Sequence, residues 1–150
     1  MLQADSAKLI LYVQYVNTTT TNRMKNFKNL TVWNKSMSVA KSCLSIINIP
    51  KDTKYNALFN QINRSAISIP SNIAEGSSRK STKEYLRYLE ISLGSAFELE
   101  TQLLLIEHAY VDREKSQAIL SELIEVQKML SGLMSTLKSE LRSKQLTAKQ

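Results

Sequence analysis

The stretch STKEYLRYLEISLGSAFELETQLLLIEH, residues 81–108, decides the fold because it joins a helix start signal to a long run of apolar residues at helical spacing. Ser81 and Glu84 have the spacing of a capping box. In that motif the serine hydroxyl accepts from the Glu84 amide, while the Glu84 carboxylate accepts from the Ser81 amide. The sequence therefore predicts a helix that begins here and continues to about His108.

One face of this predicted helix is apolar along its whole length. Projection at about 100° per residue predicts that the following side chains enter the core: Tyr85, Leu86, Leu89, Leu93, Ala96, Phe97, Leu103 and Leu104. Glu100 falls inside the same face, whereas Glu98 points away from it. A carboxylate buried without a partner costs several kcal/mol. Glu100 therefore needs a hydroxyl, an amide or a cation from another helix, unless it lies at the edge of the bundle.

The segment that follows predicts a second helix. Asp112 can cap its start. Apolar residues at spacings of three and four define its core stripe: Ile119, Leu123, Val126, Leu130, Leu133, Leu137 and Leu141. The pattern stops near Arg142, so residues 143–150 are expected to fray.

The segment before residue 81 predicts a helix from about Thr53 to Glu75, which Gly76 then stops. Its inward side chains share helical spacing: Leu58, Ile62, Ala66, Ile69 and Ile73. The opposite side carries a polar stripe: Arg64, Ser68, Ser71 and Glu75. We expect this stripe to form a polar seam between subunits, the alternatives being a recognition surface and a solvated edge.

The earliest periodic segment starts at Leu30 and ends before Pro50. It carries a stripe expected to pack in the core: Leu30, Trp33, Met37, Ala40, Leu44 and Ile47. A second apolar stripe lies beside it and is expected to contact another subunit: Val32, Val39, Cys43 and Ile46.

Four long helices with short connections predict an all-α fold, most simply an up-and-down antiparallel four-helix bundle. A chain of 150 residues with 43% hydrophobic residues, three Gly and two Pro fits one helical domain. Residues 1–23 end in a polar run and are expected to be a flexible or over-called N-terminal appendage. Residues 24–142 are expected to form the bundle, and residues 143–150 a frayed C-terminal tail.

The sequence argues against several classes of protein. Cys43 is the single cysteine and no His/Cys cluster has metal-ligand spacing, so we expect no metal site and no cofactor. A reducing cytoplasm fits best. The apolar run from Leu9 to Val16 falls far below the ~20 residues that span a bilayer, so no membrane association is expected. Without a nucleophile, a metal-ligand set or a phosphate loop, we predict no catalytic residues and no enzymatic activity.

The formal net charge of +7 is distributed unevenly. Residues 1–97 contain thirteen Lys and Arg against five Asp and Glu, while residues 98–150 contain seven against eight. Such asymmetry favours a surface that attracts polyanions. The alternative is a basic composition without a specific partner.

The strongest functional candidate is a basic segment around residue 81: Arg79, Lys80, Lys83 and Arg87. Lys80, Lys83 and Arg87 fall within about 60° of one another on a helix, so their cations could follow a phosphate backbone. The alternative is a solvated face, because Glu84 lies four residues after Lys80 and Glu90 lies three after Arg87, spacings that allow ion pairs.

An exposed aromatic ring beside cations can stack on a nucleic-acid base. Tyr85 and Tyr88 flank Arg87. Tyr85 is expected in the core, which leaves Tyr88 as the better candidate. The alternative for Tyr88 is a tyrosine at the edge of the core with its hydroxyl in water.

Three stretches carry motifs beyond periodicity: Asn29-Leu30-Thr31-Val32-Trp33, Gln61-Ile62-Asn63-Arg64-Ser65-Ala66, and Ser68-Ile69-Pro70-Ser71-Asn72-Ile73-Ala74-Glu75-Gly76. They resemble the four-helix-bundle proteins encoded in bacterial ribosomal-RNA intervening sequences, and the resemblance covers about residues 25–142. Accessory variability determinants of diversity-generating retroelements are similar relatives. Where members of the family often have two consecutive basic residues, this chain has Asn63-Arg64, so one positive charge is missing there.

The resemblance implies an up-and-down bundle, assembly of a homo-oligomer into a pentameric ring and, in the retroelement branch, binding of nucleic acid and a reverse transcriptase. We therefore predict a non-catalytic oligomeric protein that binds RNA or DNA, as an accessory factor to a reverse transcriptase if it belongs to that branch. The candidate nucleic-acid-binding residues are Arg64, Arg79, Lys80, Lys83 and Arg87. The alternative is a protein-interaction scaffold ring without direct nucleic-acid contact.

Overall fold

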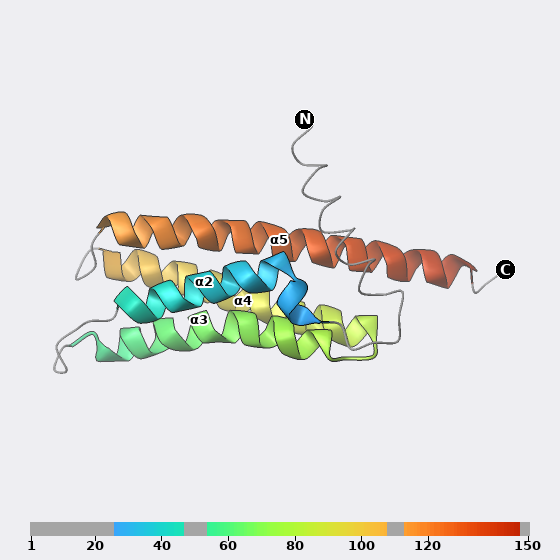
Figure 1. Ribbon diagram of the computed structural model, residues 1–150, viewed down its shortest axis with the longest axis horizontal. Helices are drawn as coiled ribbons and strands as arrows, with labels where there is room; N and C mark the ends of the chain where they lie inside the picture. The colour runs from blue at the N-terminus through green and yellow to red at the C-terminus, as the bar shows by residue number, and fades with distance from the viewer. Residues whose placement is uncertain (1–25, 47–53, 108–112, 148–150) are drawn as a thin grey trace, which may run out of the picture.

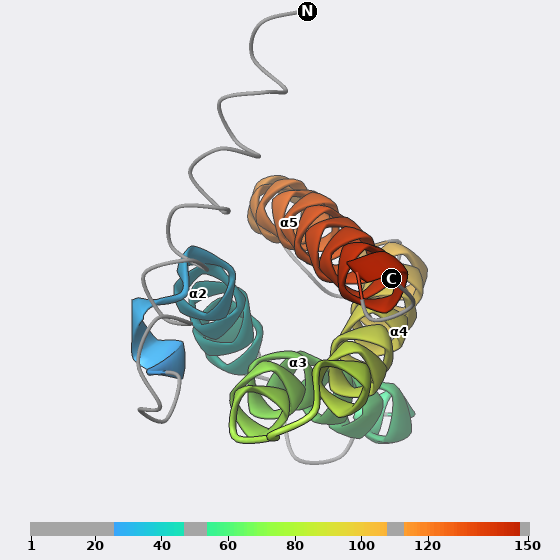
Figure 2. The same ribbon diagram turned by 90° about the vertical axis from the view of Figure 1, so that its right-hand side faces the viewer.

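The computed structural model is a bundle of four long helices, and it describes residues 26–46, 54–107 and 113–147 (Figure 1). A short 3₁₀ turn, η1 (Phe27–Asn29), precedes helices α2 (Thr31–Ile46), α3 (Asn56–Ser77), α4 (Thr82–Glu107) and α5 (Arg113–Thr147). Successive helices run in opposite directions (Figure 1). Viewed along its length, the bundle brings α2 against α3, α3 against α4, α4 against α5, and α5 against α2 (Figure 2). The predicted all-α, up-and-down antiparallel four-helix bundle is confirmed.

The helix boundaries agree with the sequence to within a few residues, which is the usual precision. The largest difference is in α5, which continues as helix to Thr147, past the boundary at Arg142 where fraying is expected. Residues 1–23, His108 and Asp112 lie outside the described residues, so the predictions made for them stay predictions.

The start of α4 is where the sequence places it, but the capping box does not form. The Ser81 carbonyl accepts from the Tyr85 amide at 3.0 Å, as in any first helical turn. The side chains of Ser81 and Glu84 are exposed and make no hydrogen bond with the described backbone. Water competes for polar groups in such an exposed position, so the helix start does not depend on this motif.

A single apolar core runs through the bundle and receives side chains from all four helices. Tyr85, Leu89 and Ala96 of α4 are buried as predicted, and so is the α5 stripe from Ile119 to Leu137. Burial raises the pKa of the Tyr85 hydroxyl, so this group stays protonated. The predicted core stripe of α5 is thereby confirmed up to Leu137.

Two core predictions for α4 are wrong. Phe97 is 52% exposed and Leu104 is 49% exposed, whereas Leu99 and Ile106 are fully buried. The buried face of α4 is turned toward α3, because serines on α4 pack directly on that helix. Ser92 donates to the Ile69 carbonyl at 3.0 Å, and because the serine side chain is short, the α4 backbone lies close to α3 at this point.

The assignment of the two α2 stripes is also reversed. Val32, Val39 and Cys43 are fully buried, although we expected them to contact another subunit. Of the stripe expected in the core, Leu30 and Ala40 are buried, while Trp33 and Met37 are only half-buried and Leu44 is 49% exposed. Both stripes have helical spacing, so periodicity alone could not decide which one faces α3 and α5. Ile47 lies outside the described residues, and the side chain of Ile46 is not described.

Helices α3 and α4 approach closely along a seam of small residues. A Cβ atom added to Gly76 would lie 2.7 Å from the Tyr88 Cβ and 2.8 Å from Cδ2 of Tyr85. Gly76 has no positive φ, and α3 continues past it to Ser77. The prediction that Gly76 stops the helix is therefore wrong: this residue is small because the two helices touch there.

The polar stripe of α3 also lies partly against α4. The hydroxyls of Ser68 and Ser95 share a hydrogen bond of 2.8 Å, and Asn72 donates to the Ser68 carbonyl at 2.8 Å. Glu75 contacts residues of the same chain, described below, while Arg64 is exposed. The polar seam that we expected between subunits is, for Ser68 and Glu75, a seam within the chain.

Helices α4 and α5 are joined by a half-buried hydrogen bond. The Gln127 side-chain amide donates to Oε2 of Glu100 at 2.7 Å. The carboxylate expected near the apolar face of α4 therefore lies at its edge and finds an amide partner. This contact and the Glu90–Lys138 pair, 3.2 Å long, fix the antiparallel register of α4 and α5.

Two glycines in different surroundings give a matched stability test: Gly76 faces α4, whereas Gly94 faces solvent. Gly76→Ala should lower the free energy of unfolding by about 1–3 kcal/mol, because the added methyl group overpacks the contact with Tyr85 and Tyr88. Gly94→Ala should instead raise it by about 0.5–1 kcal/mol, since nothing lies within 4 Å of the added Cβ and alanine favours the helix. Urea unfolding followed by circular dichroism measures both. Equal effects of the same sign would contradict the close α3–α4 contact.

Candidate nucleic-acid interface

Four of the five candidate cations lie together at one end of the bundle. Arg79 and Lys80 are in the turn between α3 and α4, and Lys83 and Arg87 are on the first two turns of α4. Lys80, Lys83 and Arg87 are exposed. Arg64 is exposed on α3, but it precedes this turn by about 20 Å of helix, at 1.5 Å per residue. The structure therefore assembles the basic segment and leaves Arg64 apart from it.

Arg79 has partners within the chain. Its guanidinium forms an ion pair with Glu75 and donates to the Tyr88 hydroxyl at 2.7 Å. The guanidinium carbon also lies 4.7 Å from the centre of the Tyr88 ring, a cation–π distance. The Nε atom of Arg79 is buried without a hydrogen-bond partner. The Arg79 guanidinium thus uses its hydrogen bonds to Glu75 and Tyr88 to hold the turn against α4.

Tyr88 closes the same cluster. Its hydroxyl donates to Oε1 of Glu75 at 2.9 Å, and its ring is half-buried under the Arg79 guanidinium. A ring in that position already has a stacking partner. Tyr88 therefore connects the end of α3 to α4. Helical periodicity does not predict this connection, because Glu75 and Tyr88 are thirteen residues apart and on different helices.

The ion pairs that would neutralise the basic segment do not form. Glu84 makes no ion pair with Lys80, and Glu90 pairs with Lys138 of α5 at 3.2 Å instead of with Arg87. Across residues 26–46, 54–107 and 113–147, Lys80, Lys83 and Arg87 have no ion-pair partner. We call these three residues the basic turn. Their charges are free to meet a ligand.

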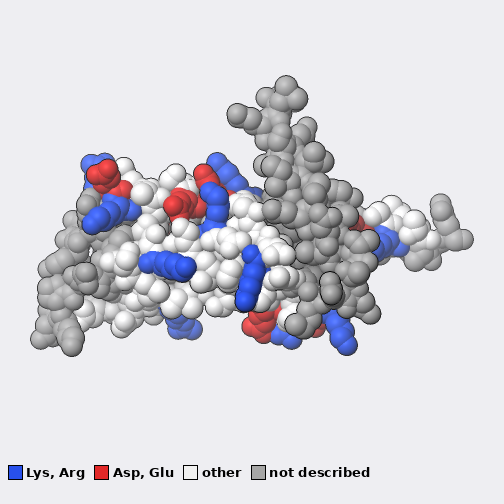
Figure 3. Space-filling model, in the orientation of Figure 1, with Lys and Arg blue, Asp and Glu red and all other residues white. Residues whose placement is uncertain are grey.

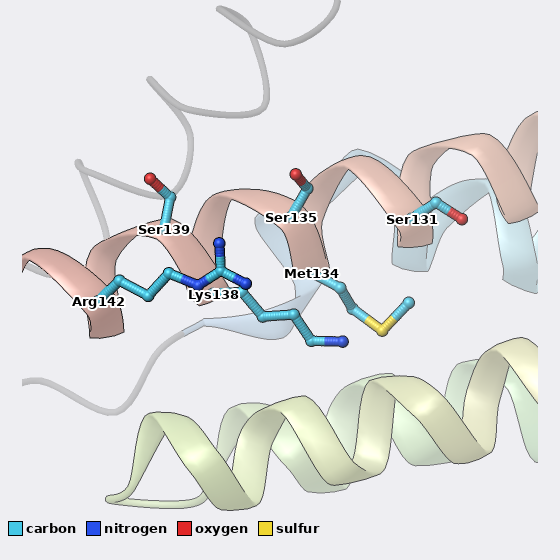
Figure 4. Close-up of a pocket in the computed structure, with 6 residues that line it drawn as sticks. All are labelled: Ser131, Met134, Ser135, Lys138, Ser139 and Arg142. Atoms are coloured by element: carbon cyan, nitrogen blue, oxygen red, sulfur yellow. The ribbon is translucent and has the colours of Figure 1, made fainter.

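A hollow beside α5 contains two more cations. It has a volume of about 500 Å³ and is lined by residues of α5 (Figure 4): Ser131, Met134, Ser135, Lys138, Ser139 and Arg142. In Figure 4 the Lys138 and Arg142 side chains extend in the same direction from successive turns of the helix. The charge distribution of the sequence does not indicate these two cations, because residues 98–150 carry no net positive charge. Their spacing of four residues was the available signal.

An apolar groove lies between α2 and α3. It has a volume of about 370 Å³, and its walls include the half-buried Trp33 and Met37 and the exposed Leu44 and Ile67. The face of the bundle shown in Figure 3 is largely uncharged over its centre, with single basic side chains set apart from one another. This groove is the outcome of the reversed α2 stripes.

The two polar side chains near the end of α3, Asn72 and Glu75, have structural partners. Asn72 is held by Ser68, and Glu75 by Arg79 and Tyr88. No group of three or more metal-binding side chains occurs in the part of the chain that the structure describes. Among the described helices, none is long and apolar enough to cross a membrane.

The fold and the exposed basic end define a small helical-bundle protein, and comparison with known proteins specifies the family. The model of the 23S rRNA-intervening sequence protein family matches residues 28–132, so the chain belongs to this family. A crystal structure of a protein of unknown function from the S23 ribosomal protein family of Bacteroides thetaiotaomicron is similar. It is 30% identical with a TM-score of 0.62, over 69% of this chain and 98% of that one. No curated protein matches.

The Glu75–Arg79–Tyr88 cluster should be energetically coupled. Tyr88→Phe removes the hydroxyl that bonds to both partners and keeps the ring, so the free energy of unfolding should fall by about 0.5–1.5 kcal/mol. Adding Arg79→Gln to that variant should then cost less than Arg79→Gln alone, because the shared hydrogen bond is already lost. Urea unfolding of the two single variants and the double variant measures the coupling. Strictly additive effects would contradict the cluster.

Proposed function

We propose that this protein is a non-catalytic bundle protein that binds RNA or DNA through the basic turn. The observation that carries the proposal is the exposure of Lys80, Lys83 and Arg87 without ion-pair partners, although two carboxylates lie within reach in the sequence. Unpaired cations at this spacing can neutralise phosphates and release their condensed counterions, which is the main source of affinity for nucleic acids.

Two further observations support the proposal. The first 97 residues carry the positive charge excess of the chain, and the basic turn lies among them. The family takes its name from a 23S rRNA intervening sequence, and the name of the similar solved structure's family is ribosomal. Both names favour RNA as the ligand. In this proposal Arg79 holds the turn in shape, and the exposed part of its guanidinium contributes to the binding surface. Arg64 contacts only a nucleic acid that is long enough to extend along α3.

Replacing the basic turn should weaken nucleic-acid binding. In the variant Lys80→Gln/Lys83→Gln/Arg87→Gln the log–log slope of affinity against salt should fall in magnitude by roughly two to three units, since each phosphate contact contributes about 0.7 on single strands and 0.9 on duplex DNA. Fluorescence anisotropy with labelled oligonucleotides at several salt concentrations measures the slope.

The matched control removes three exposed lysines elsewhere, in the variant Lys41→Gln/Lys54→Gln/Lys128→Gln. Its slope should change much less, because these residues lie on three different helices or turns and do not form one surface. Circular dichroism and light scattering establish that both variants are folded and assembled. A basic-turn variant whose slope equals that of the wild-type protein would contradict the proposal.

A second candidate function is a scaffold ring, which exposed apolar residues on two sides of the bundle favour. Leu44 and Ile67 are exposed along the α2–α3 groove. Six large apolar side chains are exposed on α4 and α5: Ile91, Phe97, Leu104, Leu105, Ile124 and Leu146. These helix pairs lie on opposite sides of the bundle (Figure 2). Two different surfaces on opposite sides suit head-to-tail association, which closes into rings.

In this second candidate the chain is a homo-oligomer, and the pentameric ring is the form that the resemblance implies. The protein bound by such a scaffold would be the reverse transcriptase in the retroelement branch. Charge would then orient the partner, and binding would persist at moderate salt because apolar contacts dominate.

Assembly is tested by light scattering coupled to size-exclusion chromatography. The wild-type protein should give a mass that is a multiple of the 17.0 kDa chain, and five times that mass in the pentameric case. Ile67→Glu should reduce the mass toward one chain, because a charge in an apolar interface is costly to desolvate. Ser139→Glu, at an exposed position of the polar hollow on α5, is the control. A wild-type protein that is monomeric at micromolar concentration would contradict assembly.

A further inference from the structure

The hollow beside α5 combines two kinds of group that bind phosphate. Lys138 and Arg142 are four residues apart and extend in the same direction, while the Ser135 and Ser139 hydroxyls lie one turn apart on the edge of α5 that faces away from α4 (Figure 4). Successive serines at this spacing are separated by about 6 Å along the helix. Cations and hydroxyls are the side chains that most often contact the phosphates and sugars of nucleic acids.

The register of α4 and α5 places this hollow at the same end of the bundle as the basic turn. Lys138 is opposite Glu90, and the helices are antiparallel. One turn from Glu90 toward the start of α4 lies Arg87, and one turn from Lys138 toward the end of α5 lies Arg142. The cations of α4 and α5 thus lie side by side at one end, although they are far apart in sequence.

Neither α5 cation is committed to a strong internal contact. Arg142 has no ion pair within the described residues, and its planar guanidinium can bind a phosphate through two hydrogen bonds. Lys138 pairs with Glu90, but the two side chains are 50% and 55% exposed. An exposed pair of this kind contributes little, so Lys138 can exchange the carboxylate for a phosphate at small cost.

We propose that the hollow beside α5 is a phosphate-binding extension of the basic turn, which takes the phosphodiester backbone of the nucleic acid as it continues from α4 onto α5. Lys138 and Arg142 neutralise phosphates, and the hydroxyls of Ser135 and Ser139 donate hydrogen bonds to phosphate oxygens. Glu90 opposes binding, because it occupies Lys138 and adds a negative charge beside the path. This inference rests on the proposed function.

The test compares salt-dependent binding of a labelled mixed-sequence RNA oligonucleotide and its DNA counterpart. Lys138→Gln/Arg142→Gln should reduce the log–log slope by roughly one to two units, as expected for two lost phosphate contacts. Lys41→Gln/Lys54→Gln removes two exposed charges, from α2 and from the turn before α3, and should change it less. Glu90→Gln should increase the affinity severalfold. The control is Glu122→Gln, which removes a carboxylate that accepts a hydrogen bond from Ser38 on α2. Its affinity should rise by no more than the change in net charge alone predicts.

The outcomes separate this inference from the proposed function. If the basic-turn variant has a reduced slope but the α5 double variant behaves like its charge-matched control, the inference is wrong and the proposed function stands. If the wild-type protein binds neither RNA nor DNA, both fail. Should the double variant not fold, Arg142→Gln alone, at an exposed position, should reduce the slope by about one unit. An Arg142→Gln slope equal to that of the wild-type protein would overturn the inference.

Discussion

The close contact between α3 and α4 is the constraint on which the rest of the structure depends. At Gly76 the two helices approach so closely that even a methyl group would collide with Tyr85 and Tyr88. Farther along, Ser92 reaches a backbone carbonyl of α3, and Ser68 and Ser95 share a hydrogen bond. Helices that pack at this distance must use small residues at the contact. This close contact sets the rotation of α4 about its axis. The rotation in turn decides which α4 side chains remain exposed to solvent.

The same contact shapes the basic end of the molecule. Because Tyr88 lies against the end of α3, its hydroxyl can reach Glu75, and Arg79 then closes over the ring. The turn is held by internal bonds made by Arg79, which leaves the neighbouring cations without competing partners. Glu90 is directed to α5, where it pairs with Lys138 rather than with Arg87. The distribution of free charge is thus a consequence of helix packing.

The four-helix architecture could be predicted from the sequence because the helical periodicity of apolar residues is strong in every helix. The α5 stripe shows this best, since Leu123, Val126 and Leu130 belong to one face only and are fully buried. The prediction of the buried face failed for α2 and part of α4, where apolar residues cover more than one face. Phe97 and Leu99 are both apolar and point in different directions, and only the position of α3 decides which is buried. For the candidate site, sequence identified the cations but not the partners of Arg79 and Glu90, which depend on contacts between helices.

The burial of Cys43 has a practical consequence. Its side chain is fully enclosed in the core, and burial raises the pKa of its thiol to about 12. Because the thiolate is the nucleophile, the folded protein protects this residue from alkylating reagents both sterically and by keeping the sulfur protonated. This single thiol lies between α2 and the rest of the core. It can therefore serve as a built-in chemical probe for the opening of the bundle at α2. The rate at which Cys43 becomes alkylated reports how often α2 separates from the bundle, without any added label.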